Sequence, residues 1–204
     1  MSLDTVPIID ISPFLSGDPE GKKAVAKAVA EACTEIGFFA ISGHGVGHHL
    51  VEDLREASHS FFEQPEPVKR ETIHPVLDTP RGLRVMQGES LGRTVRADAT
   101  PDLKEFYHYG PQDWPDEPYF NGPEGKQYFI PNIWPDKPAS FREASLAYYA
   151  EMERLIHDLG RIAATALDLP ENWFEDKLDK HVTAIRLNYY PLLADGPPPG
   201  QIRA

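Results

Sequence analysis

An alternating stretch of side chains, HVTAIRLNYYP at His181–Pro191, is the feature that most restricts the fold of this chain. Successive residues of a strand point to opposite faces of its sheet. The mostly apolar face would carry Ile185, Leu187 and Tyr189. The polar face would carry Arg186, Asn188 and Tyr190. The segment is therefore predicted to be a β-strand with one face against a hydrophobic core.

The polar face of this strand brings together a guanidinium, a carboxamide and a phenol. Arginine offers a planar pair of N–H donors to a carboxylate, and the other two groups add directional hydrogen bonds. This combination suits a small dicarboxylate or a keto acid. A solvent-exposed edge strand without a ligand would show the same alternation, so the pattern alone leaves both interpretations open.

Composition and charge limit the classes of partner. The 204 residues are 41% hydrophobic and 25% charged, which is ordinary for a globular protein. The 32 acidic residues outnumber the 20 basic ones, and the formal net charge of −12 repels nucleic acid backbones and anionic lipid surfaces. Neither nucleic acid nor a membrane is expected as a partner. Because there is no apolar run of about 18 residues and no signal-peptide pattern, we expect a cytoplasmic location.

Hydrophobic periodicity predicts three longer helices. The first begins after Asp18 and stops at Gly37, the second begins near His48 and ends by Pro65, and the third runs from Ser140 to Leu169. Each presents one apolar stripe, so each is expected to pack one face against a core.

Shorter segments complete the expected secondary structure. Val6–Ile11 and Phe38–Ile41 are β-rich, and the second is apolar on both faces, which favours a central strand. Thr79–Ser90 is predicted to be a strand or an extended loop. Pro111–Pro138 carries seven prolines and two tryptophans, which favours an ordered loop pinned by aromatic side chains instead of helix or sheet. The single cysteine, Cys33, lies beside an apolar helix stripe and is expected to be an inert, largely buried thiol.

Five segments occur together in a recognisable order and approximate spacing. They are Val6–Ile11, Ile36–Val46, Phe61–Phe62 with the PEPVK sequence that follows, Asp102–Phe106 and Leu187–Pro191. In these segments the chain resembles the N-terminal part of the isopenicillin N synthase-like family of non-haem Fe(II), 2-oxoglutarate-dependent dioxygenases. The resemblance covers nearly the whole sequence.

The resemblance implies an α+β fold in which N-terminal helices pack on a double-stranded β-helix, the jelly roll. Residues 1–180 would form the helical and mixed N-terminal region, and residues 181–204 would begin the catalytic jelly roll, which is truncated after its first strands in this chain. The resemblance also implies the cofactors Fe(II) and 2-oxoglutarate, with molecular oxygen and a small organic molecule as substrates.

Site residues follow from the same resemblance. In relatives the Asn-Tyr-Tyr strand lines the cofactor pocket, which assigns Asn188 and Tyr190 to 2-oxoglutarate, with Arg186 on the same face. The segment that matches Arg81 to Glu89 lies near the substrate entrance in relatives. The substrate candidates in this segment are Arg84, Gln87 and Glu89.

The chain departs from the family pattern in its metal ligands. Relatives hold iron with a His-x-Asp pair and a distant His, but none of the eight histidines here is followed two positions later by Asp or Glu. The ligands are therefore expected beyond residue 204, and no metal ligand is assigned in this chain. The complete protein would be the enzyme, and the 204-residue fragment would be inactive.

Two alternatives remain open on the sequence. The chain could be a non-catalytic module, either a truncated relic or an interaction partner. It could also belong to an oxidase that uses no 2-oxoglutarate. Isopenicillin N synthase itself is such an oxidase. His44 and His48 have the i, i+4 spacing of metal ligands, but their glycine-rich surroundings favour a structural turn with a hydrogen-bonding role for His44. The substrate, the reaction outcome and the oligomeric state are not determined by these residues.

Overall fold

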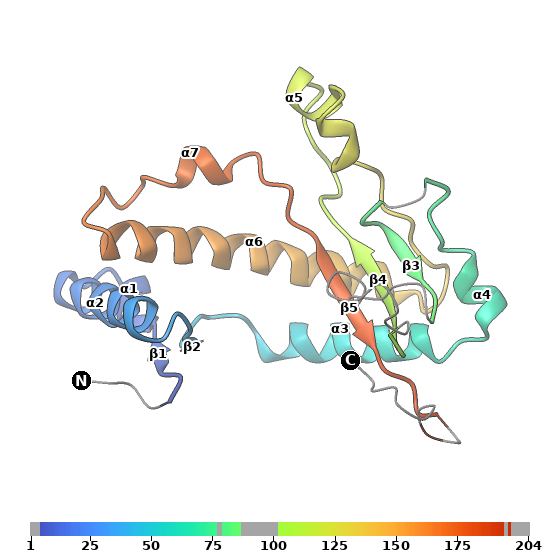
Figure 1. Ribbon diagram of the computed structural model, residues 1–204, viewed down its shortest axis with the longest axis horizontal. Helices are drawn as coiled ribbons and strands as arrows, with labels where there is room; N and C mark the ends of the chain where they lie inside the picture. Colours follow the sequence, from blue (N-terminus) through green and yellow to red (C-terminus); the bar gives the residue numbers. More distant parts are fainter. Residues whose placement is uncertain (1–4, 77–78, 87–101, 194–195, 197–204) are drawn as a thin grey trace. The chain divides into compact units, whose positions relative to one another are not determined.

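The computed structural model describes residues 5–76, 79–86, 102–193 and 196. The chain forms two compact units, residues 1–50 with 150–181 and residues 51–149 with 182–204. Two helices, α3 (His48–Phe62) and α6 (Ser140–Ala166), contribute residues to both units (Figure 1). Both start where the periodicity predicted.

A pair of short parallel strands organises the first unit. β1 (Ile8–Asp10) pairs with β2 (Ala40–Ser42), and the two are joined in sequence through α1 (Ser12–Leu15) and α2 (Pro19–Glu35). The last part of α6 and α7 (Glu175–Leu178) complete the unit. A parallel pair requires such a helical crossover between its strands.

Local sequence signals set both ends of α2. The Asp18 carboxylate accepts a hydrogen bond from Gly21 N at 2.6 Å and so satisfies one of the N–H groups that the first turn leaves unpaired. Gly37 takes a φ of +82°, a left-handed conformation that ends a helix with little strain in glycine. The predicted helix is thereby confirmed.

The core of the first unit lies between α2, β1 and the end of α6. Its buried members are Ile9, Ile11, Phe14, Val25, Val29, Ala32 and Ile162. Val25, Val29 and Ala32 come from α2 and have the i, i+4, i+7 spacing of a single helix face. The stripe therefore buries the face that the periodicity indicated.

Two predictions for this unit are wrong. Cys33 is exposed, because it lies one position past the buried Ala32 and is thus rotated about 100° away from the core around the helix. The predicted central strand Phe38–Ile41 starts two residues later, at Ala40, and β2 pairs only with β1 among the described residues. Phe38 is 71% exposed, since it lies in the connection that the Gly37 turn begins.

An antiparallel sheet forms the centre of the second unit. Its strands are β3 (Gly82–Arg84), β4 (Glu105–Tyr109) and β5 (Ile185–Tyr189), in the order β3-β4-β5. The strand predicted at the end of the chain is confirmed as β5. α4 (Glu66–Arg70) follows α3 in the same unit.

One face of this sheet packs against α3 and the start of α6. The fully buried cluster consists of Ala57, Phe61, Phe62, Leu83, Tyr107, Tyr109, Phe141 and Tyr149. Ile185, Leu187 and Tyr189 pack against this cluster, so the apolar face of β5 is the one that the alternation predicted. The opposite face of β5 is consequently turned away from the core.

The proline-rich segment 111–138 is ordered and carries paired aromatic rings, as expected. Trp114 lies 5.8 Å from Phe129, and Trp134 lies 5.5 Å from Tyr109, between ring centroids. The segment also contains two short helices that were not predicted, α5 (Pro118–Asn121) and the 3-10 helix η2 (Gly125–Gln127). Pro118 stands at the first position of α5, where proline is tolerated because its missing N–H would be unpaired there anyway.

A buried arginine ties this segment to β3. Arg81 is 1% exposed and donates to the carbonyl oxygens of Ile130, Pro80 and Tyr128 at 3.0, 2.7 and 2.6 Å. Gly110 makes room for it, since a Cβ at that position would lie 2.3 Å from Arg81 Nη2. Burial lowers the pKa of the Arg81 guanidinium, which has carbonyls instead of carboxylates as partners.

Helices with a parallel strand pair in one unit and an antiparallel sheet in the other confirm the α+β class. The proposed division into residues 1–180 and 181–204 concerns the complete protein and stays a prediction. In the described part of the chain, no helix combines the length and apolar character needed to cross a membrane.

Candidate functional site

The strand register assembles the candidate site on the sheet face opposite the core. Arg84 of β3 is directly opposite Phe106 of β4, which in turn is opposite Asn188 of β5. In the next row His108 of β4 is opposite Arg186 of β5. These five side chains therefore share one face of the sheet.

Arg186 leans over this face toward Asn188. Its guanidinium carbon lies 3.6 Å from the centroid of the Phe106 ring, a cation–π contact. Its Nε donates to Asn188 Oδ1 at 2.9 Å. The predicted neighbours Arg186 and Asn188 are thus brought into direct contact.

The contact with Arg186 also fixes the orientation of the Asn188 amide. Because Oδ1 accepts from Arg186, the amide nitrogen with its two N–H donors points the other way. Asn188 is exposed, so these donors can meet a ligand. A carboxylate or a keto oxygen is the chemical group that such donors suit.

Tyr190 directly follows the last residue of β5 and is 40% exposed. If the extended backbone continues by one residue, its phenol belongs to the same face as Arg186 and Asn188. The assignment of Tyr190 to the site remains a prediction.

The predicted substrate residues separate into two groups. Arg84 lies on the same sheet face as Asn188, on the far side of Phe106, and its Nη2 donates to Thr79 O at 2.8 Å. Gln87 and Glu89 lie outside the described residues. Arg84 therefore joins the candidate site, and the other two stay sequence predictions.

The sequence analysis did not predict two residues of this sheet face, Phe106 and His108. Phe106 is only 3% exposed, and its ring centroid lies 5.1 Å from that of His108. The alternation in Glu105–Tyr109 would have placed both on one face, but only the pairing with β5 shows which face that is.

The opposite face anchors β5. Tyr189 stacks on Phe62, with centroids 5.0 Å apart and an angle of 2° between the rings. Its hydroxyl donates a hydrogen bond to Glu63. This hydrogen bond raises the pKa of Tyr189 to about 12, with smaller contributions from burial and from the charge of Glu63. The phenol stays protonated at neutral pH, so it serves as an anchor for the strand.

A cavity of about 460 Å³ runs along β5. The side from α3 consists of Val51, Leu54, Arg55, Ser58, His59 and Phe62, and all five residues of β5 line the other side together with Tyr148. Its volume lies in the range of small-molecule pockets. Arg186 and Asn188 are among its lining residues, but α3 packs on the apolar face of β5, so this cavity lies opposite the face that their side chains share with Phe106.

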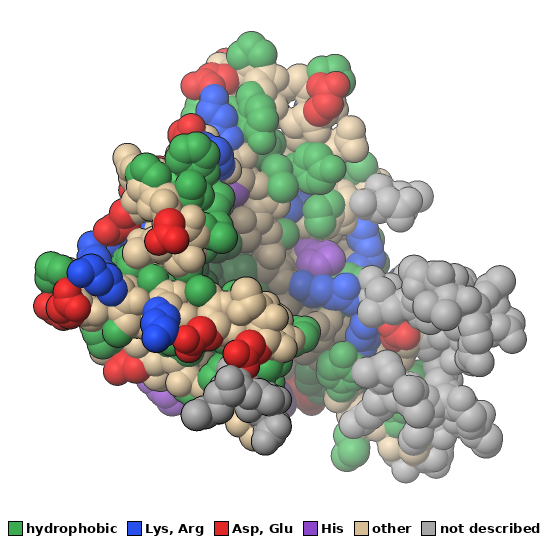
Figure 2. Space-filling model, turned by 60° about the vertical axis from the view of Figure 1, so that its left-hand side comes forward, with side chains coloured by type: hydrophobic (Ala, Val, Ile, Leu, Met, Phe, Trp, Pro, Cys, Tyr) green, Lys and Arg blue, Asp and Glu red, His purple; other side chains and the backbone are tan. Residues whose placement is uncertain are grey.

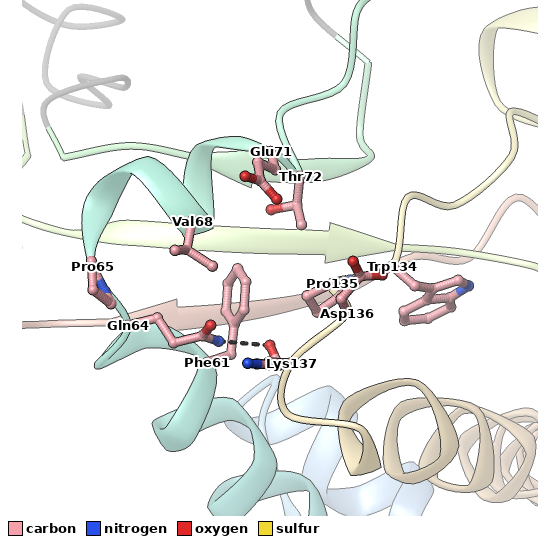
Figure 3. A pocket seen from close by; sticks show the side chains of 10 residues that line it. All are labelled: Phe61, Gln64, Pro65, Val68, Glu71, Thr72, Trp134, Pro135, Asp136 and Lys137. Atoms are coloured by element: carbon pink, nitrogen blue, oxygen red, sulfur yellow. Dashed lines mark hydrogen bonds between the residues drawn. The ribbon is translucent and has the colours of Figure 1, made fainter.

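A second cavity, of about 550 Å³, lies between the end of α3, α4 and the segment 134–137 (Figure 3). Gln64 Nε2 donates to Lys137 O at 2.6 Å across it, drawn as the dashed line. Its lining combines Phe61 and Trp134 with the carboxylates of Glu71 and Asp136. None of the predicted site residues lines it.

His44 of the first unit has a structural role. His44 Nδ1 accepts a hydrogen bond from Val46 N at 3.2 Å, and His44 O accepts one from Arg154 Nη2 at 3.0 Å. The predicted hydrogen-bonding role of His44 in its turn is confirmed. Among the residues that the structure describes, no three His, Cys, Asp or Glu side chains are grouped so that they could hold a metal ion.

Acidic and basic side chains are interspersed over the face of the molecule shown in Figure 2. This mixture, with the net charge of −12, differs from the basic stripe of a nucleic-acid-binding surface.

Comparison with known proteins places the chain in a family. The family model described as "non-haem dioxygenase in morphine synthesis N-terminal" matches residues 6–137. The chain belongs to this family. The dioxygenase resemblance inferred from the five sequence segments is thereby confirmed.

Individual relatives agree with the family assignment. The chain is 30% identical over 188 residues to the 2-oxoglutarate-Fe(II) type oxidoreductase hxnY of Emericella nidulans, covering 91% of this chain and 52% of the relative. It is 30% identical over 197 residues to isopenicillin N synthase of Streptomyces griseus, covering 95% of this chain and 57% of that protein.

Among solved structures, a full-length protein of Neurospora crassa in complex with alpha-KG superposes with a TM-score of 0.72 at 25% identity. The match covers 97% of this chain and 59% of that one. The chain thus spans little more than half the length of each of these three proteins.

Proposed function

We propose that the complete protein is an Fe(II)- and 2-oxoglutarate-dependent oxygenase that oxidises a small organic substrate with molecular oxygen and releases succinate and CO2. Membership of the dioxygenase family supports the reaction class. The observation that carries the proposal is the Arg186–Asn188 contact, in which two polar side chains meet on the outward face of β5.

The residues present fit 2-oxoglutarate. The keto acid has two carboxylates and a keto oxygen, all of them acceptors, and this face offers the donors of Asn188, Arg186 and Tyr190. In this proposal Asn188 binds the keto acid, Arg186 orients the Asn188 amide and adds positive charge, and Tyr190 contributes its hydroxyl. When bound, iron would activate molecular oxygen, which is the oxidant, and 2-oxoglutarate would supply two electrons as it is oxidised to succinate and CO2.

The described residues do not provide a set of iron ligands, so no step is assigned to the metal here. We infer that the ligands come from residues beyond position 204, because the relatives are nearly twice as long as the part that this chain matches. By the same inference, residues 1–204 alone would be inactive and the complete protein active.

The substrate is proposed to be a small molecule. Solved complexes of the Neurospora crassa protein contain thymine or 5-formyluracil, both of which are small molecules. The similarity supports the size class of the ligand. It does not carry over to its identity, because the identity between the two chains is only 24–25%.

The test is a spectroscopic titration of the complete gene product. The anaerobic Fe(II)-loaded protein is titrated with 2-oxoglutarate, and we expect the visible charge-transfer band of chelated keto acid. After oxygen is admitted, we expect metal-dependent succinate release. Asn188→Ala should weaken 2-oxoglutarate binding by about tenfold or more, since it removes a directed hydrogen-bonding group. Asn172→Ala, an exposed asparagine in the other unit, is the matched control and should change nothing.

The alternatives give different results in this titration. Oxygen consumption without a 2-oxoglutarate band would indicate an oxidase, the alternative that the similarity to isopenicillin N synthase keeps in view. Absence of both iron binding and oxygen consumption in the complete gene product would indicate a non-catalytic module. Either result refutes the proposal.

A further inference from the structure

The candidate sheet face is basic from edge to edge. Its six strand positions are Gly82, Arg84, Phe106, His108, Arg186 and Asn188. None of these positions carries a carboxylate, although the whole chain has 32 acidic residues. The acidic residue of β4, Glu105, belongs to the buried face, where it pairs with Lys69 at 2.5 Å.

Phe106 forms a rigid base for the charged groups. Its ring is 3% exposed and is contacted by Arg186 at 3.6 Å and by His108 at 5.1 Å. The N–H donors of a guanidinium lie at the edge of its plane, so they do not point into an aromatic ring over which it is held. The positive charge of Arg186 is thereby fixed over the row that also contains Arg84.

Arg84 is held at one end only. Among the described residues, its hydrogen bonding consists of the bond from Nη2 to Thr79 O at 2.8 Å. Thr79 itself is 4% exposed, and its hydroxyl has no partner in that part of the chain. A guanidinium and a buried hydroxyl therefore lie close together with hydrogen-bonding capacity that the described residues do not use.

We propose that the substrate carries a carboxylate and that Arg84 binds it, with the fixed charge of Arg186 adding attraction. This inference rests on the proposed function, because it assigns 2-oxoglutarate to Asn188 and Tyr190 and leaves Arg84 for the second ligand. Arg84 lies two strands away from Asn188, a separation of about 10 Å. The two residues thus serve separate anions on one face.

The charge geometry supports a carboxylate over a neutral substrate. A guanidinium meets a carboxylate with two parallel N–H···O bonds, and such charge-assisted bonds are stronger than those to a neutral carbonyl. Within the described ranges, the partner of Arg84 is a neutral carbonyl, so a neutral ligand would leave its charge uncompensated there. A carboxylate supplies the opposite charge.

The experiment measures binding to the complete gene product in the presence of Fe(II) and saturating 2-oxoglutarate, without oxygen. The ligands are a panel of small alkyl and aryl monocarboxylic acids, each paired with its primary amide. The binding of each ligand is measured by calorimetry and ligand-observed NMR. We expect acids to bind more tightly than their amides. Arg84→Gln should remove about tenfold or more of the acid affinity without changing that of the amides.

Three controls make the outcome specific. Arg70→Gln replaces an exposed arginine of α4 that pairs with Glu66, and it should leave acid binding unchanged. Arg84→Lys keeps the charge but not the planar pair of donors, and should retain part of the affinity. The melting temperature of each variant reports whether it folds, and the charge-transfer titration reports its 2-oxoglutarate affinity.

The possible results separate this inference from the proposed function. If the wild-type protein does not bind 2-oxoglutarate, the proposed function fails, and this inference falls with it. If 2-oxoglutarate binds but acids bind no better than amides, or no member of the panel binds, the inference alone is overturned. It is also overturned if Arg84→Gln weakens 2-oxoglutarate as strongly as the acids.

Discussion

Replacing Arg81 by methionine should destabilise the second unit by about 3 kcal/mol, because three backbone carbonyls lose a charged donor at once. Methionine keeps most of the buried stem volume but offers no N–H group. The carbonyls of Pro80, Tyr128 and Ile130 would then have no donor from this position.

The magnitude follows from the structure. A hydrogen bond from a charged donor contributes about 1.5–3 kcal/mol, and the cost of burying the guanidinium, visible as its lowered pKa, offsets part of this. A net value of about 1 kcal/mol for each of the three bonds gives the stated total. Arg81→Lys should lie between, since an ammonium can reach fewer of the three oxygens than a planar guanidinium.

Urea unfolding measures the change, with Arg55→Met as the matched control. Arg55 forms an exposed ion pair with Glu52, so its loss should cost less than about 1 kcal/mol. Hydrogen exchange of residues 128–134 provides a local readout and should accelerate in Arg81→Met. The reasoning would be refuted if Arg81→Met and Arg55→Met had the same free energy of unfolding in urea and hydrogen exchange in residues 128–134 were unchanged.

Two further outcomes are expected from ion pairs. Lys69→Met should lower the free energy of unfolding in urea by about 3–5 kcal/mol, because it leaves the buried Glu105 carboxylate without a counter-charge. The double variant Lys69→Met with Glu105→Leu should recover most of that loss. A double variant as unstable as the single one would contradict this. In the first unit, the hydrogen bond from Lys22 at 2.7 Å lowers the pKa of Glu171, so its stabilisation is present above the unfolded value near 4.5 and is lost as the pH falls through the lowered folded value. Glu171→Gln should therefore lower the stability by less than about 1 kcal/mol at pH 7, since the Glu171 side chain is 38% exposed and screened by solvent. Thermal melts should show that the stability difference from the wild-type protein vanishes in acid. A stability difference that grows below pH 4 would contradict the lowered pKa of Glu171.

Local sequence signals predicted much of the secondary structure. The Asp18 cap, the Gly37 stop and the apolar stripe of α2 act within one helix, and the alternation in β5 acts within one strand. The errors arose where the deciding contact is not local. Cys33 is adjacent to a buried stripe but rotated out of it, and the start of β2 depends on its pairing with β1.

The candidate site shows the same division. Alternation placed Arg186 and Asn188 together, and the family resemblance added Arg84. The sequence did not identify Phe106 or His108 as members, because strand register joins residues about 80 positions apart and is set by the packing of the opposite, apolar face.

The sequence by itself determined the three longer helices, the strand β5 and its polar side, and the family that the chain resembles, since these properties depend on side chains a few positions apart. Only the tertiary structure decided that Arg84, Phe106 and Asn188 form one row and that Arg81 is buried among carbonyls. The physical reason is that the core selects one register among several with the same local pattern, and that register fixes which distant side chains meet on the other face.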